Sequence, residues 1–368
     1  MQKKIILLYP YFNGISGAFN RYLLLEKLFK RTNIKVKLIV LKDKRSNSAF
    51  TNIFNKLFKF IQVESIIFFY SVLRNYYFIT DFNPSIVALF SKNVLIQIHD
   101  VSWENKLFAR HNIFFYKLLK VFIKYYSNII TVSKTSMIAI CKVSMRKKRT
   151  FYLYNSVSKE FIIHSNKIGQ YHDELRKNNI PKSIKLNLPN ILYIATLTPR
   201  KSHLDLLSAL SKTNKFLNIN LVGLPSDKRI LELIKNKINE RSEYINFNIN
   251  YFPKLSQKDL CDLLIYSSAY ISTSLYEGFG IPVLEANLYN LPLIIRDLDI
   301  NRELFPKAKF FKSNLQLSNF LNDLEPLSDE EFKKRKTIAL NMQQDNLIKA
   351  FNYLTLSQEL KSIILSLK

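Results

Sequence analysis

Short runs of apolar residues alternate along the chain with longer stretches in which apolar residues recur at helical spacing. In the first half, residues 5–9 and 94–98 are almost wholly apolar. Runs of this length are typical of strands that are buried on both faces of a parallel sheet. The same half has further predicted strands at residues 36–41, 129–132 and 152–154, and a predicted helix around residues 21–30.

The alternation stops in a polar stretch, residues 166–187, and then starts again. The second half has predicted strands at residues 190–194, 219–223, 245–248, 269–273 and 293–295, and predicted helices at 203–211, 227–240, 283–289 and from 328 onward. Strands that alternate with helices indicate parallel sheets covered by helices. We therefore expect two doubly wound α/β domains in series that face a cleft, with the polar stretch as a hinge. The predicted divisions are an amino-terminal domain 1–165, a linker 166–187, a second domain 188–345, and a terminal helix 346–368 that crosses back to the first domain.

Composition agrees with a folded two-domain protein. The chain has 368 residues, and its 28 Phe and 20 Tyr supply too much apolar surface for wholesale disorder. Its two cysteines, Cys141 and Cys261, lie far apart, which excludes a disulfide scaffold or a zinc ribbon and suits a reducing compartment. The apolar run 5–9 is too short for a signal peptide, and the stretch 61–80 carries Glu64 and Arg74, which makes a poor membrane span. We expect a cytoplasmic protein that is soluble or peripheral to a membrane.

Charge changes this picture. The net charge is +27, and residues 1–165 contain 27 basic and 7 acidic residues. Between residues 106 and 149 there are eleven Lys or Arg and no Asp or Glu. The amino-terminal half is therefore expected to face an anionic partner, such as a phospholipid surface, a nucleic acid or a phosphorylated substrate. A composition rich in Lys throughout is the alternative explanation.

The most informative motif is a glycine-containing loop between a predicted strand and a predicted helix. Residues 276–285 read YEGFGIPVLE, so Glu277 and Glu285 flank the loop eight residues apart. Gly278 and Gly280 allow backbone amides to approach an anion closely. Two carboxylates around such amides suit a ligand with hydroxyl groups on both sides of a phosphate, which describes a nucleotide sugar. An ordinary strand–helix turn with two surface glutamates remains the alternative.

Two weaker motifs also follow predicted strands, where open α/β sheets bind ligands. Residues 192–201 read LYIATLTPRK, and Arg200 and Lys201 could neutralise a diphosphate, one with a forked donor and one with a point charge. His99 and Asp100 follow the strand 94–98. A solvated cation pair and a structural histidine are the alternatives.

These segments, in this order, resemble the retaining glycosyltransferases of family 4, which have the GT-B fold of two facing Rossmann-like domains. Residues 274–280 (SLYEGFG) together with Glu285 resemble the E-x7-E motif of that family, and residues 193–201 resemble its strand with a Pro-Arg-Lys loop. Further similar segments are His99-Asp100, the strand 129–133, the turn 154–157 and the glycine loop 14–17.

The resemblance implies a role for each matching residue. It assigns catalytic roles to Glu277, His99 and Lys201. The residues that it assigns to donor binding are Arg200, Lys201, Glu285, Thr196, Gly278, Phe279 and Gly280. The residues that it assigns to the acceptor side are Gly14, Gly17 and Asp100. Glu285 is expected to hold the nucleotide ribose, Glu277 to contact the donor sugar, and His99 to lie near the transferred sugar.

Some positions depart from the family pattern. Ala195 stands where the family often has Gly, and Thr196 stands where many members have Arg, which places more of the phosphate neutralisation on Arg200 and Lys201. Asn290 replaces a helix-ending Gly, which is tolerable because Asn adopts the left-handed region. Protein cations do the work of a metal in this family, so we expect no metal and no cofactor. The segment 297–299 (DLD) resembles the metal-binding motif of a different transferase fold, and we do not assign a metal to it.

The expected function is transfer of a sugar, of mannose type, from a nucleotide-sugar donor to a saccharide or lipid-linked acceptor, with retention at the anomeric carbon. Such acceptors belong to bacterial O-antigen, capsule or exopolysaccharide assembly. In residues 114–126 the lysines recur at spacings of three and four, as in a helix that lies on an anionic membrane or in an ordinary surface helix. The protein would then work peripherally on the inner face of the plasma membrane.

A non-enzymatic function is the alternative. A basic nucleic-acid- or membrane-binding protein on a degenerate GT-B scaffold without turnover would explain the charge. It would not explain the block that contains Glu277 and Glu285, and the sequence has no recognisable nucleic-acid-binding module. Nucleic acid is therefore not an expected partner.

Overall fold

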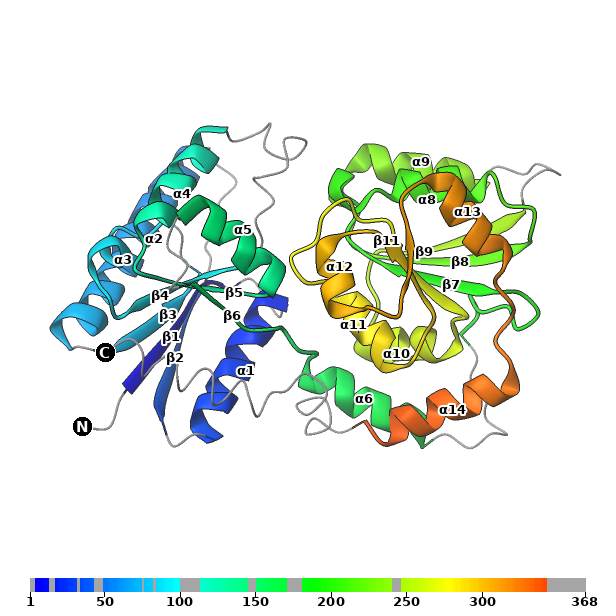
Figure 1. Ribbon diagram of the computed structural model, residues 1–368, viewed down its shortest axis with the longest axis horizontal. Coiled ribbons are helices and arrows are strands. Elements are labelled where there is room, and N and C mark those ends of the chain that lie inside the picture. Colours follow the sequence, from blue (N-terminus) through cyan, green and yellow to red (C-terminus); the bar gives the residue numbers. More distant parts are fainter. Residues whose placement is uncertain are drawn as a thin grey trace. The chain divides into compact units, whose positions relative to one another are not determined.

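The computed structural model describes residues 4–12, 17–31, 34–42, 49–74, 76–81, 84–99, 113–144, 150–170, 181–239 and 246–342. They divide into two compact units, one within residues 1–156 and one within residues 157–347. Each unit contains a six-stranded parallel sheet with helices on both faces (Figure 1). The predicted fold class, two doubly wound α/β domains, is confirmed. The predicted terminal helix 346–368 lies outside the described residues.

The sheet of the first unit has the strand order β2-β1-β3-β4-β5-β6. Its strands are β1 (Lys4–Phe12), β2 (Lys35–Lys42), β3 (Tyr77–Thr80), β4 (Val94–Ile98), β5 (Asn128–Thr131) and β6 (Thr150–Tyr152). Its helices are α1 (Gly17–Arg31), α2 (Ala49–Phe68), the π-helical turn η1 (Phe69–Leu73), α3 (Val87–Phe90), α4 (Ile113–Tyr125) and α5 (Lys134–Ser144). The sequence pattern predicted all of these strands except β3.

Helix α1 covers one face of this sheet, and α2, α3 and α4 cover the other (Figure 1). Tyr22, Leu25 and Phe29 of α1 are buried against strand side chains such as Leu7 and Leu95. Every residue of β4 and β5 is buried, which explains why apolar residues predominate on both faces of these strands. The buried polar residues in them are Gln97, Asn128 and Thr131.

The sheet of the second unit has the strand order β12-β11-β10-β7-β8-β9. Its strands are β7 (Asn190–Ile194), β8 (Leu217–Val222), β9 (Phe247–Phe252), β10 (Ala269–Ser272), β11 (Leu293–Arg296) and β12 (Lys309–Phe311). Its helices are α6 (Lys159–Gly169), the 3-10 turn η5 (Pro199–Lys201), α8 (His203–Leu210), α9 (Lys228–Asn239), α10 (Gln257–Tyr266), α11 (Ile281–Leu288), α12 (Asp299–Leu304), α13 (Asn314–Asn322) and α14 (Asp329–Leu340).

The largest described core of this unit lies between the sheet and helices α8, α9 and α13. Leu206, Ile234 and Leu321 are buried there against strand residues that include Ile219 and Ile294. Helices α10 and α11 lie on the other face of the sheet (Figure 1). Because both faces are covered, the loops at the carboxyl ends of the strands are the places where polar groups can meet a ligand.

Helix α6 belongs to the second unit, so the boundary between the units falls after Ser156 rather than after residue 165. The physical reason is packing, because α6 contacts α10 and α14. At Gly169 the helices approach so closely that a Cβ atom would lie 2.3 Å from the backbone nitrogen of Leu340. The Tyr289 hydroxyl also donates to Ser165 Oγ at 2.8 Å, which ties the end of α11 to α6.

Candidate functional site

The order in which strands are added to the second sheet reverses between β7 and β10. From β7 the chain adds β8 and β9 on one side, whereas β10, β11 and β12 follow on the other side. Ligands of open α/β sheets bind outside the carboxyl ends of the strands at such a switch point. The two loops that leave this point are residues 195–202 after β7 and residues 273–280 after β10, and both carry sequence-predicted donor-binding residues.

Hydrogen bonds from the ends of the neighbouring strands β7 and β10 hold turn η5 in place. The Tyr193 hydroxyl donates to the backbone oxygen of Lys201. Thr273 Oγ1, just after β10, shares its hydroxyl hydrogen between the backbone oxygens of Lys201 at 3.1 Å and Ser202 at 2.8 Å. Ser202 has a φ of 47°, a left-handed conformation that is costly for a residue with a side chain. These bonds fix the turn that carries Arg200 and Lys201.

Glu277 meets both predicted cations. Lys201 Nζ donates to Glu277 Oε1, and Arg200 Nη1 lies 3.5 Å from Glu277 Oε2. Arg200 Nη1 also donates to the backbone oxygen of Tyr276 at 2.9 Å. The side chain of Glu277 is 8% exposed and that of Lys201 is 13% exposed. The structure thus brings three predicted residues together in one ion-paired cluster with two positive charges and one negative charge.

Helix α11 begins directly after this cluster. Gly280 precedes the helix with a φ of 84°, and Pro282 occupies the first helical turn. Only glycine adopts such a φ readily, which accounts for a Gly at this position. Phe279 is buried beside it, and Gly278 lies in the loop that leads to it. N–H groups at the start of an eight-residue helix can donate hydrogen bonds to an anion, which is the role that the sequence predicts for Phe279 and Gly280.

Glu285 lies on α11 and is buried, with 8% of its surface exposed. Burial raises the pKa of its carboxyl group to about 8. A carboxyl group with such a pKa is mainly uncharged at neutral pH, and it needs donors such as ribose hydroxyls to stabilise its ionised form. After the helix, Asn290 has a φ of 56°, which confirms the left-handed conformation expected at this position.

A second layer of polar residues supports η5 and the loop after β10. Arg296, at the end of β11, donates from Nε to the backbone oxygen of Thr273 at 3.0 Å and from Nη2 to Asp205 Oδ2. Asp205 also accepts from Ser202 Oγ at 2.7 Å. His203 is buried between these elements and stacks on Tyr193, and its burial lowers its pKa to about 4. This histidine is therefore neutral beside Lys201.

Gly223 supports the loop after β7 through its lack of a side chain. A Cβ atom at this position would lie 1.9 Å from the backbone oxygen of Ala195. The close approach is part of the sheet edge, where Ala195 N donates to the oxygen of Val222 at 2.8 Å and Leu197 N donates to the oxygen of Leu224 at 2.9 Å. The loop that leads to η5 is thus packed against the end of β8.

In the first unit, His99 follows β4 and is partly exposed. Its Nε2 lies 3.6 Å from Asp81 Oδ2 and 3.2 Å from Gln97 Nε2. Asp81 follows β3, the strand next to β4, so the two residues meet at one sheet edge. Arg21 of α1 is buried behind them and donates to Gln97 Oε1 at 2.5 Å and to Asn155 Oδ1 at 2.8 Å.

Not every predicted residue enters these clusters. Thr196 is exposed in the loop after β7, and Gly17 is the first residue of α1. Gly14 and Asp100 lie outside the described residues. His99 and Glu277 belong to different units, and each contributes to a cluster within its own unit.

Several residues of these clusters were not found from the sequence. They are Tyr193, Asp205, Gly223, Thr273, Arg296, Arg21 and Asp81. Arg296 and Thr273 stand at the carboxyl ends of predicted strands, a position that could have indicated them. Asp81 was missed because β3 was not predicted.

The segment 297–299 is used for internal ion pairs. Arg302 Nε and Nη2 donate to the two oxygens of Asp297 at 2.5 and 2.8 Å, and Lys312 Nζ lies 3.6 Å from Asp297 Oδ2. Hydrogen bonding by Arg302 holds the pKa of Asp297 below its usual value. Within the described ranges, no three side chains of His, Cys, Asp or Glu gather closely enough to hold a metal ion.

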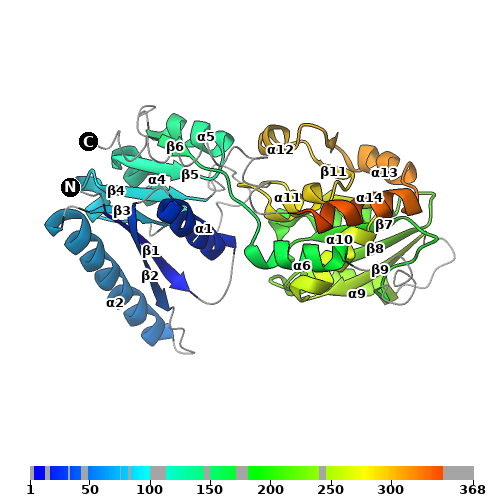
Figure 2. The same cartoon turned by 90° about the horizontal axis from the view of Figure 1, so that it is seen from below.

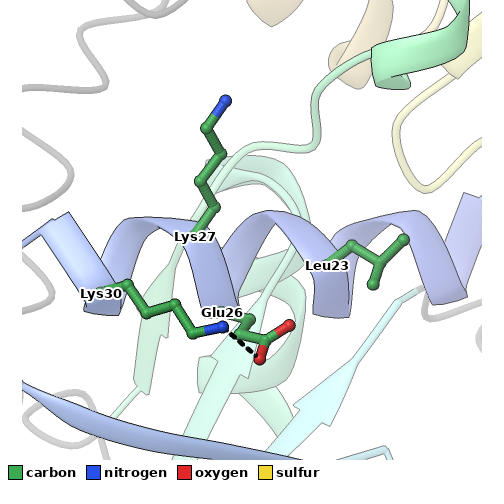
Figure 3. Close-up of a pocket in the computed structure, with 4 residues that line it drawn as sticks. All are labelled: Leu23, Glu26, Lys27 and Lys30. Atoms are coloured by element: carbon green, nitrogen blue, oxygen red, sulfur yellow. Dashed lines mark ion pairs between the residues drawn. The ribbon is translucent and has the colours of Figure 1, made fainter.

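A surface depression of about 450 Å³ lies along α1 (Figure 3). Its lining residues are Leu23, Glu26, Lys27 and Lys30. Glu26 and Lys30 form an ion pair at 2.9 Å. None of the predicted site residues lines this depression, and we assign no role in sugar transfer to it. In the part of the chain that the structure describes, no helix is both long and apolar enough to span a membrane.

Part of the chain is similar in sequence to known proteins. Residues 176–345 match the family model described as glycosyl transferases group 1. The serotype-specific mannosyltransferase WbdA of Escherichia coli is 28% identical over 140 residues, which are 37% of this chain and 17% of that protein. The chain thus matches about a sixth of the length of this curated relative.

Solved structures share the fold over nearly the whole chain. The crystal structure of Anabaena Alr3699/HepE in complex with UDP and glucose has a TM-score of 0.65 at 15% identity, and it covers 99% of this chain and 100% of that chain. WaaG, a glycosyltransferase involved in lipopolysaccharide biosynthesis, has a TM-score of 0.54 at 14% identity and covers 94% and 92% of the two chains. Residues 176–345 are therefore similar to the glycosyl transferases group 1 family, within a chain that has the GT-B fold.

Proposed function

We propose that the protein is a retaining glycosyltransferase. It moves a sugar from a nucleotide-sugar donor to a saccharide or lipid-linked acceptor in bacterial cell-surface polysaccharide synthesis. The observation that carries this proposal is the cluster at the switch point of the second sheet, where Arg200 and Lys201 meet Glu277 directly before helix α11.

The cluster suits the chemistry of a departing diphosphate. During transfer, the bond between the anomeric carbon and the phosphate oxygen breaks, and negative charge grows on the diphosphate. Arg200, Lys201 and the amides at the start of α11 are fixed in advance, so they stabilise that charge without reorganising. The new bond to the acceptor oxygen forms on the same face of the sugar, and the leaving phosphate takes the acceptor proton.

The carboxyl groups suit the two hydroxyl-bearing ends of the donor. Glu277 accepts hydrogen bonds from hydroxyl groups of the sugar while it orients Lys201. Glu285 accepts hydrogen bonds from the ribose hydroxyls. His99, held beside Asp81, is the proposed catalytic residue of the first unit. The reaction as proposed requires no metal and no cofactor, so chelation of divalent cations should leave the rate unchanged.

The sugar and the pathway are proposed from relatives. The serotype-specific mannosyltransferase WbdA favours a mannose-type donor. We propose an O-antigen or capsule as the product. The relative WaaG favours an acceptor that belongs to the cell envelope. We further propose that the protein works in the cytoplasm at the inner face of the plasma membrane, because such acceptors are assembled there on lipid carriers.

The proposal is tested by product analysis. Purified protein is incubated with GDP-mannose or UDP-sugars and with lipid-linked or free saccharide acceptors, with and without a chelator. We expect one donor to be consumed, and NMR of the product to show the anomeric configuration of that donor. Inversion of the configuration would refute the retaining mechanism. Donor binding without any transfer to the acceptors would favour a degenerate scaffold.

Glu285 gives donor binding an expected pH dependence. Its carboxyl pKa of about 8 means that the ionised form, which binds the ribose, is scarce below that pH. Affinity for a nucleotide sugar should therefore rise roughly 25-fold between pH 6.5 and 8.5, and binding should release protons. Calorimetry in buffers of different ionisation enthalpy measures both quantities.

The matched control is Glu285→Gln, which should bind weakly with no such pH dependence. The same raised pKa predicts a stability effect of definite sign. The contribution of Glu285 to the free energy of unfolding is fully present below pH 4.5, the pKa of its carboxyl group in the unfolded chain. That contribution is lost as the pH rises through the folded pKa of about 8. Glu285→Gln should thus gain melting temperature over wild type at pH 8 but not at pH 4.5. An unchanged pH profile in the variant would contradict the assignment.

A further inference from the structure

One face of the first unit exposes large apolar side chains on four consecutive helical elements. Phe90 of α3 is 82% exposed, and Phe58 of α2 and Leu73 of η1 are each more than 60% exposed. The other members of this apolar face are Leu57, Ile61, Phe68, Phe69, Val72, Ile86, Leu118, Val121 and Tyr125. Soluble monomers rarely expose so many apolar groups on one side, so such a face marks an interaction surface.

Two polar contacts hold these elements side by side. Glu64 of α2 accepts the backbone N–H groups of Ile86 and Val87, both at 2.9 Å, and so caps the start of α3. The Tyr126 hydroxyl, next to the end of α4, accepts the N–H of Ser85 at 2.8 Å. Figure 1 shows α2, α3 and α4 on the same side of the sheet, opposite α1, and Figure 2 gives a second view of α2. The exposed side chains therefore belong to one fixed surface.

Cations accompany the apolar groups on these elements. Exposed lysines and arginines are Lys56, Arg74, Lys92, Lys117, Lys120 and Lys124. On α4 the lysines recur every three or four residues. Each is followed directly in the sequence by an exposed apolar residue, namely Leu118, Val121 and Tyr125. The guanidinium of Arg74 lies 5.3 Å from the ring centre of Phe69, and Lys124 Nζ lies 6.0 Å from that of Tyr125.

Acidic groups are nearly absent from the same elements. Across residues 49–74, 84–99 and 113–144, Glu64 is the only Asp or Glu, and it is used to cap α3. Among the described residues, the face therefore combines apolar side chains with an excess of positive charge. An anionic phospholipid bilayer complements both features at once, because apolar groups enter the acyl boundary while cations contact the phosphates.

We propose that the outward face of α2, η1, α3 and α4 is a docking surface for an anionic phospholipid bilayer. This inference deepens the proposed function at the inner face of the plasma membrane and rests on that part of it. It extends the membrane contact from a single lysine-bearing helix to a surface of four elements, in which Phe58, Leu73 and Phe90 are the anchors.

Two other occupants are disfavoured by charge. A second copy of the chain would present the same cationic face and would be repelled. The carboxyl-terminal segment 346–368 carries three Lys and one Glu, so it is also cationic and offers no complement. A nucleic acid would satisfy the cations but would leave aliphatic side chains such as Leu73 and Val121 exposed to water.

The surface is tested by sedimentation of purified protein with sucrose-loaded vesicles. One set is made of phosphatidylcholine alone, and the other contains phosphatidylglycerol as well. Wild type should bind only the second set, and added salt should weaken binding. Phe58→Ser/Leu73→Ser/Phe90→Ser should lower binding at least tenfold. Lys117→Gln/Lys120→Gln/Lys124→Gln should lower it roughly 100-fold, since each lysine near an anionic surface changes affinity about fivefold.

The matched control is Phe216→Ser/Leu315→Ser, which removes two similarly exposed apolar side chains from the second unit and should bind as wild type does. Melting temperatures verify that each variant is folded. Equal binding to both vesicle sets, absence of binding, or equal loss in the control would each overturn the proposal. Concentration-dependent dimerisation that the triple serine variant abolishes, or salt-sensitive binding of RNA in place of vesicles, would assign the face to another partner. Donor binding is measured on the same variants and should be unchanged, so failure of the surface is distinguishable from failure of the transferase proposal.

Discussion

Glu277→Gln is expected to lower kcat for sugar transfer by a factor of about 10²–10³, the usual effect of losing one preorganised electrostatic group. The substitution keeps the shape of the side chain but removes the charge that holds Lys201 Nζ and faces Arg200. Lys201→Ala should reduce the rate by a similar factor because the departing diphosphate then loses a fixed cation. Initial rates with a saturating donor measure both effects.

The two substitutions should not be additive. If Glu277 and Lys201 act as one unit, the double variant should be little slower than either single variant. Lys201→Ala also leaves a buried carboxylate with Arg200 alone, so it should cost about 1–3 kcal/mol of stability while the protein remains folded. A matched control is Glu325→Gln, which breaks the ion pair with Lys215 on the surface of the same unit. Full activity in Glu277→Gln or Lys201→Ala would refute the site.

Gly223→Ala should be the most damaging substitution at a residue that touches no substrate. The new Cβ atom would overlap the backbone oxygen of Ala195, at 1.9 Å, so the loop after β7 or the end of β8 must move. Overpacking of this kind costs about 3 kcal/mol, the upper end of the usual range. The melting temperature should fall by roughly 6–12 °C for a unit of this size.

The displaced loop leads directly into η5, so donor affinity should also fall in the folded fraction of Gly223→Ala. Thermal melts with and without a nucleotide sugar separate the two effects. Ser226→Ala is the matched control, because it alters an exposed residue of the same connection that already has a Cβ atom. A variant with wild-type stability would show that the loop is not packed against β8 as described.

The parts of the site that are local in sequence could be predicted from the sequence. Glu277, Gly280 and Glu285 belong to one strand–loop–helix connection, and Arg200 and Lys201 belong to another, so residue type and spacing were enough. Asn290 was predicted for the same reason, because a helix end favours a left-handed residue and few residue types adopt that conformation.

The residues that join these connections could not be predicted in the same way. Tyr193, Thr273 and Arg296 act across neighbouring strands, and the order β11-β10-β7 that makes them neighbours is a property of the folded sheet. Strand β3 was missed because the apolar stretch before it continues through α2 and η1 without a clear turn signal. The proposed docking surface could be predicted only for α4, because the contacts of Glu64 and Tyr126 that join α2, α3 and α4 are long-range.

The central claim is that the second unit binds a nucleotide sugar through the cluster at its switch point. The most direct test is the thermal stabilisation of purified protein by a panel of UDP-, GDP-, dTDP- and ADP-sugars, with Glu285→Ala measured beside wild type. A donor at 100 times its Kd should stabilise wild type by about 2.7 kcal/mol. We predict that one class of donor stabilises wild type and has little effect on Glu285→Ala. Absence of stabilisation by every donor, or equal stabilisation of the variant, would contradict the claim.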